Sequence, residues 1–451
     1  MTCVLRTERA ASGRWQLAAL GLLLALSPAV QAELLFSDAL QRAAERDPAY
    51  AAAFAAQRAD REAGEQERAR LRPSLSLSGS GSFVASDSRF AFGAERDEYP
   101  VWSARLEARQ PVLRLDWSAR RQRADARDAL ADARFQQAQT DFVVRVAQRY
   151  LEAMRAQDQL RLMQAEVEAV RRSLDDVRKR YEVELVPGTD LKEAQARYDL
   201  ARAELIRAEA ELEWRLDALA ELTGPFDAPL PRLAPALAPP PLPATSIDDW
   251  LALLEDNNAT LRIAALDVEI AKADHRSRKA EAQPQADLVA SAGRADASAS
   301  ELGSLQDEAR VGVELVIPIY AGGINHSRVR EAEARLEATR LIHERLLAEA
   351  RREVRTQFRN FEVARISVDA LTAGLESARS AEQAVMAGYD AGTRTIADVL
   401  DARRRVAEAE RNLNQARYDL LTTIVLLQAS AGTLDAEDLV ALDALLEVPR
   451  S

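Results

Sequence analysis

The second half of the chain repeats the first half at an offset of 208 residues. The stretch from Tyr181 to Gly224 aligns without gaps with the stretch from Tyr389 to Gly432. Identical pairs in this alignment include Asp190 with Asp398, Ala194 with Ala402, Arg197 with Arg405, Leu205 with Leu413 and Leu212 with Leu420. The repeat is far longer than the roughly 20–50-residue units of solenoids. We therefore expect two similar structural units, residues 33–224 and residues 247–432.

Residues 1–32 have the pattern of a secretory signal peptide. Arginines precede an apolar run from Leu17 to Leu26, and small residues end at Ala32, where we expect cleavage. The apolar run is too short to cross a bilayer as a helix. The only cysteine is Cys3, so the mature chain is expected to have no disulfide, catalytic thiol or cysteine-bound metal.

The chain is acidic, and no catalytic signature is visible in it. Its formal net charge is −12, which does not favour binding to nucleic acid. The three histidines, His275, His326 and His343, have no ligand spacing, and neither a phosphate-binding loop nor a nucleophile elbow is present. We expect a protein that is not an enzyme and uses no cofactor and no metal.

Long helices are predicted in both halves. No proline or glycine interrupts the sequence from about Trp117 to Tyr181, which as a helix would be roughly 95 Å long. Its counterpart runs from about Asn325 to Tyr389. Each long helix is followed by a short break and a second helix with a coiled-coil seam in steps of three and four. The seam residues are Leu191, Ala194, Tyr198, Ala201, Leu205, Ala208 and Leu212, and then Val399, Ala402, Val406, Ala409, Leu413, Ala416 and Leu420.

Each half also has a pair of segments with the period-two alternation of strands. We predict these strands over residues 74–86, 101–111, 285–294 and 309–318. About ten residues is the length of a tilted transmembrane strand, with small or apolar residues facing lipid and charges facing a lumen. Four strands cannot close a barrel, and open edges are not tolerated in lipid. Several chains are therefore expected to share one barrel.

Two segments lie outside the repeats. Residues 225–246 contain eight of the 17 prolines and are expected to form a stiff, extended link. Residues 433–451 form a short acidic tail that contains several leucines.

One polar motif stands at the break between the two helices of the second half. It reads YDAGTRTIADVLD from Tyr389 to Asp401. Asp398 and Asp401 are three positions apart and so share a helix face. In isolation, acidic residues in a first helical turn can simply complement the helix dipole.

The chain resembles the TolC family of trimeric outer membrane channels in a longer segment, YDAGTRTIADVLDARRRVAEAERNLNQARYDLL, which is followed by GTLDAEDLVAL. In the first half, the segment TDLKEAQARYDLARAEL resembles the same family. The resemblance implies a mainly α-helical, internally duplicated fold with a transmembrane β part. A homotrimer would build one 12-stranded β-barrel, four strands per chain, continuous with a long helical barrel of coiled-coil hairpins that closes at its tip. Asp398 and Asp401 match a pore-constricting acidic ring. Tyr389 and Arg394 match residues that tie the inner helix pair to its neighbours through Thr189 and Asp190.

The resemblance further implies a channel-tunnel in the cell outer membrane, in contact with its lipid and extending far into the periplasm. Such a channel is a passive duct for drug efflux, type I protein secretion or both. A periplasmic adaptor and an inner-membrane pump of the RND, ABC or MFS type open it. Two departures bear on the strength of closure. Ser173 and Met386 occupy positions where the family can add a polar tie, and Glu184 replaces a glycine of the family.

Two alternatives are a periplasmic adaptor and a secreted coiled-coil structural protein. An adaptor would have a single helical hairpin in a small β-domain. A coiled-coil rod would leave the strand pairs and the polar motif unexplained.

Overall fold

A computed structural model describes residues 33–90, 93–234, 241–297 and 304–447, so the predicted signal peptide lies outside the described residues. Two copies of one six-element unit follow each other along the chain. The elements of the first copy are α1 (Phe36–Arg46), α2 (Pro48–Ala69), β1 (Ser74–Phe90), β2 (Gly93–Leu113), α3 (Trp117–Glu182) and α4 (Gly188–Thr223). Those of the second are α5 (Ile247–Asn257), α6 (Ala259–Ala280), β4 (Gln285–Asp296), β5 (Leu305–Val316), α7 (Ile324–Asp390) and α8 (Ile396–Ala431).

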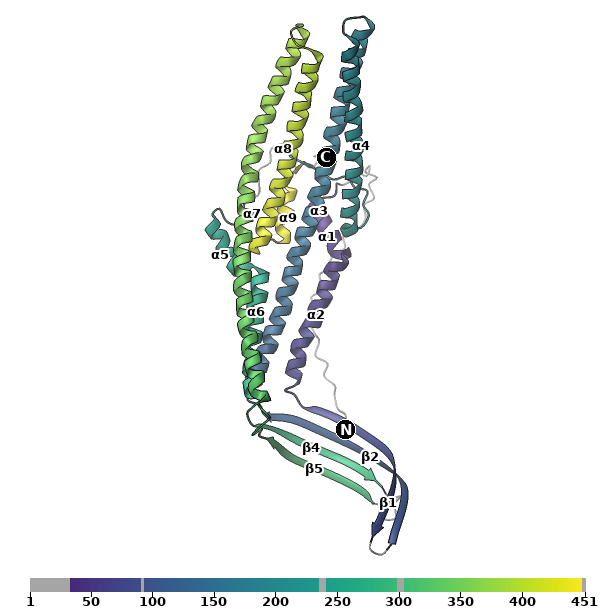
Figure 1. The fold of residues 1–451 in the computed structure, drawn as a ribbon, viewed down its shortest axis with the longest axis vertical. Coiled ribbons are helices and arrows are strands. Elements are labelled where there is room, and N and C mark those ends of the chain that lie inside the picture. The colour runs from purple at the N-terminus through teal and green to yellow at the C-terminus, as the bar shows by residue number, and fades with distance from the viewer. Residues whose placement is uncertain (1–32, 91–92, 235–240, 298–303, 448–451) are drawn as a thin grey trace, which may run out of the picture.

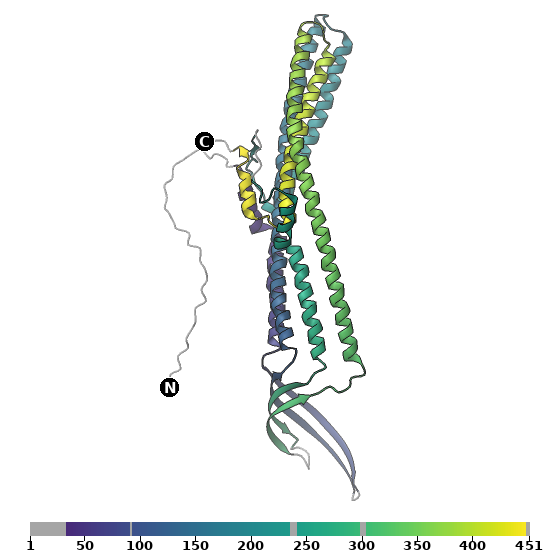
Figure 2. The same cartoon turned by 90° about the vertical axis from the view of Figure 1, so that its left-hand side faces the viewer.

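The molecule is elongated, with the sheet at one end of the long helices and two helical hairpins at the other end (Figure 1). Helices α3 and α7 have 66 and 67 residues, or about 100 Å at the rise of an α-helix. A view turned by 90° shows α3, α4, α7 and α8 together at the hairpin end (Figure 2). Within the described residues, no helix has both the length and the hydropathy that crossing a membrane requires.

Alanines on the predicted seams are buried where the two helices of each hairpin pack together. In α4 these are Ala194, Ala201 and Ala208, and in α8 they are Ala402 and Ala416. A methyl side chain lets two helix backbones approach closely and costs little side-chain entropy on burial. The hairpins therefore remain narrow over all 36 residues of α4 and of α8.

The strands form one antiparallel sheet in the order β1-β2-β4-β5. β2 pairs with β4 and so joins the two repeats, with Arg109 opposite both Ser74 of β1 and Val289 of β4. The strands predicted over 74–86 and 101–111 extend to Phe90 and from Gly93 to Leu113. The prediction over 309–318 was shifted, because the hairpin partner Gln285–Asp296 pairs with Leu305–Val316.

The pairing register sorts the side chains onto two different faces. One face has serine and charged residues: Ser76, Ser78, Ser80, Arg105, Glu107, Arg109, Asp287, Ser291, Arg310 and Glu314. The other has apolar residues: Leu75, Leu77, Ala104, Leu106, Leu288, Ala290, Val311, Val313 and Leu315. The apolar face is open in the single chain, and Val311 is 76% exposed. An exposed apolar face of this kind suits contact with lipid.

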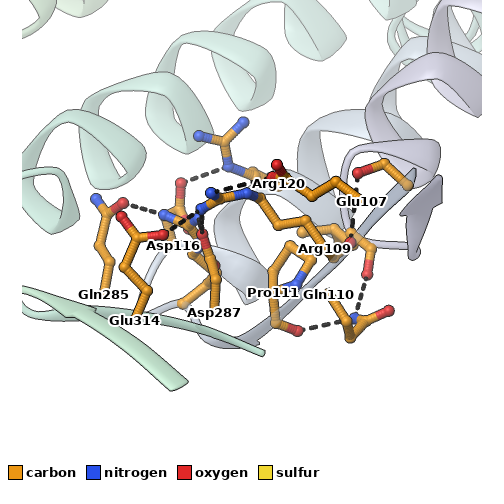
Figure 3. A network of polar contacts seen from close by, with 12 residues as sticks. Glu107, Arg109, Gln110, Pro111, Asp116, Arg120, Gln285, Asp287 and Glu314 are labelled. Carbon is orange, nitrogen blue, oxygen red and sulfur yellow. Dashed lines mark hydrogen bonds and ion pairs between the residues drawn. The ribbon is translucent and has the colours of Figure 1, made fainter. Parts of the chain in front are cut away.

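Ion pairs brace the base of the sheet where it meets the helices (Figure 3). Arg109 of β2 lies 3.2 Å from Asp287 of β4 and 2.8 Å from Glu314 of β5. Arg114, between β2 and α3, also contacts Asp287, at 2.7 Å. Asp287 is largely buried, so its charge is compensated by the two guanidinium groups. This network links strands of both repeats to the start of the helical part.

The proline-rich link is joined to the C-terminal tail. Strand β3 (Arg232–Leu233) of the link pairs with β6 (Leu446–Glu447) of the tail, which also forms α9 (Ala436–Asp443). The Asp443 carboxylate accepts hydrogen bonds from the N–H groups of Phe36 and Ser37, at 2.8 and 3.2 Å, and so caps α1 from the other end of the chain. Residues 235–240 and 448–451 lie outside the described residues.

An apolar core surrounds this junction at the middle of the helices. It buries aromatic and aliphatic side chains from both repeats, including Phe36, Tyr150, Leu219, Tyr418 and Leu439. The Tyr150 hydroxyl donates to the carbonyl of Leu34. The core thus fixes the first residues of the described chain against both hairpins.

The two hairpin loops have the same turn but a different residue at its strained position. The N–H of Leu185 donates to the carbonyl of Arg180, and the N–H of Thr393 donates to that of Gly388, five residues back in each case. Glu184 and its counterpart Gly392 both have positive φ, 60° and 75°. This left-handed conformation disfavours any residue with a Cβ, by roughly 1–2 kcal/mol.

We expect Glu184→Gly to stabilise the first hairpin loop by about 1 kcal/mol, because glycine relieves the left-handed strain. The measurement is amide hydrogen exchange at Leu185, which should slow about fivefold. Gly392→Ala is the matched control, since a Cβ there meets no atom within 4 Å. It should accelerate exchange at Thr393 by a similar factor. Unchanged or faster exchange at Leu185 in Glu184→Gly would contradict the strain assignment.

Candidate gate at the helix hairpin tips

Thr189 and Asp190 lie in the first turn of α4, directly after the first hairpin loop. The helix begins at Gly188 without a side-chain cap on its N-cap residue, Pro187. The Thr189 hydroxyl donates to the Asp190 carboxylate at 3.3 Å. Asp190 therefore faces the tip with acceptor capacity left over, at a helix end that favours negative charge.

Asp398 forms a capping box at the start of α8. The Thr395 hydroxyl accepts from the N–H of Asp398 at 3.2 Å, while the Asp398 carboxylate accepts from the N–H and the hydroxyl of Thr395 at 2.9 and 3.0 Å. The hydrogen bonds from Thr395, together with the nearby Arg394 charge, hold the pKa of Asp398 below its usual value. Asp398 is therefore ionised at neutral pH in the single chain.

Asp401 lies one turn further along α8 and is paired locally. Its two carboxylate oxygens contact Arg404 and Arg405, each at 2.9 Å. Such exposed pairs within one helix are weak, about 0.3–0.5 kcal/mol. Both acids of the predicted ring are thus at the tip, and neither is held in a contact that would be costly to break.

Tyr389, in the last turn of α7, has its ring packed on the first hairpin. The guanidinium carbon of Arg180 lies 4.7 Å from the ring centroid. The Tyr389 hydroxyl is buried and has no hydrogen-bond partner among the described residues. Burial raises the pKa of Tyr389, the charge of Arg180 opposes this shift, and the charges of Asp176 and Asp190 add to it. A buried hydroxyl donor surrounded by carboxylates is suited to donate to one of them.

Arg394 lies in the loop between α7 and α8 and is not paired with Asp190 within the described chain. Its N–H donates to the carbonyl of Gly388 at 3.2 Å. A Cβ on Gly388 would come within 2.8 Å of Arg394 Cγ, so the small residue lets the arginine side chain lie over the end of α7. The guanidinium therefore remains available to a group outside this chain.

An apolar cluster holds the two hairpins together beneath these polar residues. Its buried members are Leu174, Val177, Ala194, Ile396, Val399 and Leu400, from α3, α4 and α8. Tyr389 and Met386 pack against it. The structure thus brings all six predicted gate residues to one end of the molecule.

Ser173 and Met386, which the resemblance predicted to lack a polar tie, both contact one arginine. Arg403 of α8 donates from Nη1 to the Ser173 hydroxyl and from Nη2 to the Met386 sulfur, the latter at 3.4 Å. Sequence reasoning missed Arg403 because it lies outside the motif, and an arginine in an Arg-rich helix carries no signal of its own. The spacing of 230 residues from Ser173 becomes visible only when α3 and α8 lie side by side.

Across the described ranges, no cluster of three or more His, Cys, Asp or Glu side chains is placed to hold a metal ion. What the tip offers is a set of carboxylates and hydrogen-bond donors at the ends of hairpins joined by a small apolar contact. This chemistry can attract cations and can hold or release neighbouring helices.

Comparison with known proteins shows which family has this architecture. The model of the outer membrane efflux protein family matches residues 39–225 and 250–433, which are the two repeats. Outer membrane protein TolC of Vibrio cholerae is 30% identical over 429 residues, 94% of this chain and 96% of the relative. The alkaline protease secretion protein AprF of Pseudomonas aeruginosa is 30% identical over 413 residues, 89% of this chain and 85% of the relative.

A solved structure has the same fold. The CmeC outer membrane channel of Campylobacter jejuni superposes with a TM-score of 0.76 at 16% sequence identity, covering 91% of this chain and 90% of that chain. The prediction made from the motif is therefore confirmed, and this chain belongs to the outer membrane efflux protein family.

Proposed function

We propose that this outer membrane protein is the channel of a tripartite export system, through which cargo leaves the cell without chemical change. The observation that carries the proposal is the sheet, with one charged face and one exposed apolar face, continuous with helices about 100 Å long. The apolar face fits the hydrocarbon of the membrane. The helices are long enough to extend the conduit well beyond it.

Three copies would complete the channel. The edge strands β1 and β5 leave backbone groups unpaired, which is unfavourable in lipid. Pairing β5 of one copy with β1 of the next removes all edges and gives a closed barrel of 12 strands, a number that suits the family. The charged faces would then line a water-filled lumen, and the hairpins would form a helical tunnel.

The energy for transport would come from an inner-membrane pump, coupled through a periplasmic adaptor. A passive duct needs such partners because its own residues provide positioning and charge only. The two duplicated hairpins disfavour the alternative hypothesis that the chain is an adaptor. The four-strand sheet, to which both repeats contribute, also disfavours it. A purely structural rod would have no use for an exposed apolar sheet face.

The tip would serve as the gate of the duct. Within the part of the chain that the structure describes, the Arg394 guanidinium is not paired with Asp190, the buried Tyr389 hydroxyl has no hydrogen-bond partner, and Asp190 has acceptor capacity left beside Thr189. Ties from Arg394 and Tyr389 to Asp190 and Thr189, of the same or a neighbouring copy, would satisfy all of these groups with charge-assisted hydrogen bonds. Asp398 and Asp401 of three copies would place six carboxylates around the opening.

Cross-linking of the detergent-extracted protein tests the assembly. We expect the products to stop at trimer, because three four-strand sheets complete the barrel. Purified trimer should also form ion-conducting channels in planar bilayers. A product that stops at dimer or tetramer, or a soluble periplasmic monomer, would overturn the proposal.

Removing the ties should open the tip. We expect Tyr389→Phe combined with Arg394→Ser to raise single-channel conductance severalfold, since the apolar cluster alone would hold the hairpins. Fold stability should change little, because the coiled-coil seams are untouched. Arg359→Ser, which removes an exposed arginine from the middle of α7, is the control and should behave as wild type. Wild-type conductance in the double variant would remove Tyr389 and Arg394 from the gate.

The acidic ring should bind cations. A divalent or hexammine cation added from the tip side is expected to block the wild-type channel, and Asp398→Ala with Asp401→Ala should abolish the block. Crowding of six carboxylates raises the pKa of some members, against the local effect of Thr395 on Asp398. Block should therefore weaken as the pH falls toward about 4, where the carboxylates gain protons. Asp419→Ala, on the same helix, is the control. Persistent block in the double variant would place the ring elsewhere.

A further inference from the structure

Helix α8 runs antiparallel to α3 and contacts it through three polar rungs. The Tyr418 hydroxyl donates to Asp158 at 2.6 Å, Arg411 lies 2.7 Å from Glu166, and Arg403 donates to the Ser173 hydroxyl. Successive rungs are seven or eight residues apart on both helices, so they share one face of each helix. The ladder runs from the apolar core at the middle of the molecule toward the hairpin tip.

The rung nearest the tip joins three helices through one guanidinium. On α3, Arg403 Nη1 contacts the Ser173 hydroxyl and lies 3.4 Å from the carbonyl of Ala169. On α7, its Nη2 lies 3.4 Å from the Met386 sulfur and its Nε lies 3.5 Å from the Glu382 carboxylate. Ser173 is buried, at 6% exposure. Arg403 therefore uses its fork of donors to hold α8 against both α3 and α7.

The middle rung is a partly buried ion pair at the wall of a cavity. The side chains of Arg411 and Glu166 are 26% and 17% exposed. Burial raises the pKa of Glu166, the charge of Arg411 opposes this shift, and Glu204 and Glu410 add to it. Without Arg411, the Glu166 charge would be left uncompensated.

A cavity of about 560 Å³ lies between the hairpins at this level. Residues of both rungs line it, including Glu166, Ala169, Arg403 and Arg411. Apolar side chains therefore do not fill the space between α3 and α8 here. Polar contacts across a solvent-accessible cavity can be broken and remade without exposing much apolar surface, whereas separating a packed apolar interface would be costly.

The ladder is absent from the equivalent helix of the first repeat. The counterparts of Arg403, Arg411 and Tyr418 in α4 are Gln195, Ala203 and Ala210, none of which carries a charge. Gln195 donates within its own helix, to Asp199. The two repeats share a backbone, so the difference is one of side-chain chemistry.

We propose that Arg403 and Arg411 form a latch that fastens the tip-side half of α8 to α3 within one chain and positions the gate in its closed state. The latch rests on the proposed gate, and it acts about 8 to 20 Å along α8 from Asp398. Opening would release these rungs, while the Tyr418 rung, embedded in the apolar core, remains as the fixed end of the moving segment.

Charge-reversal rescue in planar bilayers tests the latch. Arg411→Glu and Glu166→Arg should each raise single-channel conductance severalfold in the absence of partner proteins. The two changes together should return the single-channel conductance toward the wild-type value, because the ion pair is rebuilt with opposite polarity. A purely structural role of either residue predicts no such rescue.

Arg403 is tested with Arg403→Met, which keeps an apolar stem and removes the donors, and with Ser173→Ala. Both should raise conductance, Arg403→Met by more because Arg403 also contacts Met386 and Glu382. The combined variant should match Arg403→Met alone, since the contact with Ser173 is already lost in it. Arg379→Met is the matched control, because Arg379 pairs with Glu410 at 2.6 Å within a single hairpin. It should conduct as wild type. Trimer yield and thermal unfolding establish that each variant is folded.

Comparison with Tyr389→Phe/Arg394→Ser separates the two proposals. If that variant opens the channel while the Arg403 and Arg411 variants conduct as wild type, the latch is wrong and the gate stands. If only the latch variants open it, the gate assignment at the tip is wrong. Failure of the Glu166–Arg411 swap to restore conductance would also overturn the latch.

Discussion

Close packing of α3 on α4 and of α7 on α8 along alanine-containing seams is the interaction on which the rest of the structure depends. Buried Ala194, Ala201 and Ala208 on one side, and Ala402 and Ala416 on the other, allow two helices to run together for 36 residues with little bulk between them. The seams hold both loops at the same end of the molecule. Every contact of the candidate gate is built on that placement.

The kind of contact that joins the two hairpins changes along their length. At the middle, Tyr150 and Tyr418 lie in a large apolar core shared by both repeats, and such cores resist rearrangement because they are densely packed. Toward the tip the contact changes to polar rungs, a cavity and a small apolar cluster. A rigid middle and a lightly fastened tip are what a duct needs if it is to open at one end without losing its fold.

The two repeats have the same backbone fold, as expected of a duplication, but their side chains differ at equivalent positions. The loops have the same turn, yet Glu184 stands in a left-handed conformation where the second copy has Gly392. Three polar side chains of α8 face α3, whereas α4 has Gln195, Ala203 and Ala210 at those positions. At the sheet end, by contrast, the two repeats are joined, since Arg109 of the first is paired with acids of the second.

The sequence by itself determined the features that depend on neighbouring residues: the duplication, the long helices and their breaks, the alternation of the strands, and the motif from Tyr389 to Asp401. Helix periodicity and strand alternation are local, so they can be read without knowing the fold. Tertiary structure decided which segments meet. It extended the strands by pairing, joined the proline-rich link to the tail, placed Asp443 on α1 and brought Arg403 to Ser173. Apart from the strand extension, these contacts join residues that are hundreds of positions apart. Their geometry follows from the way the helices and strands pack, which no local pattern encodes.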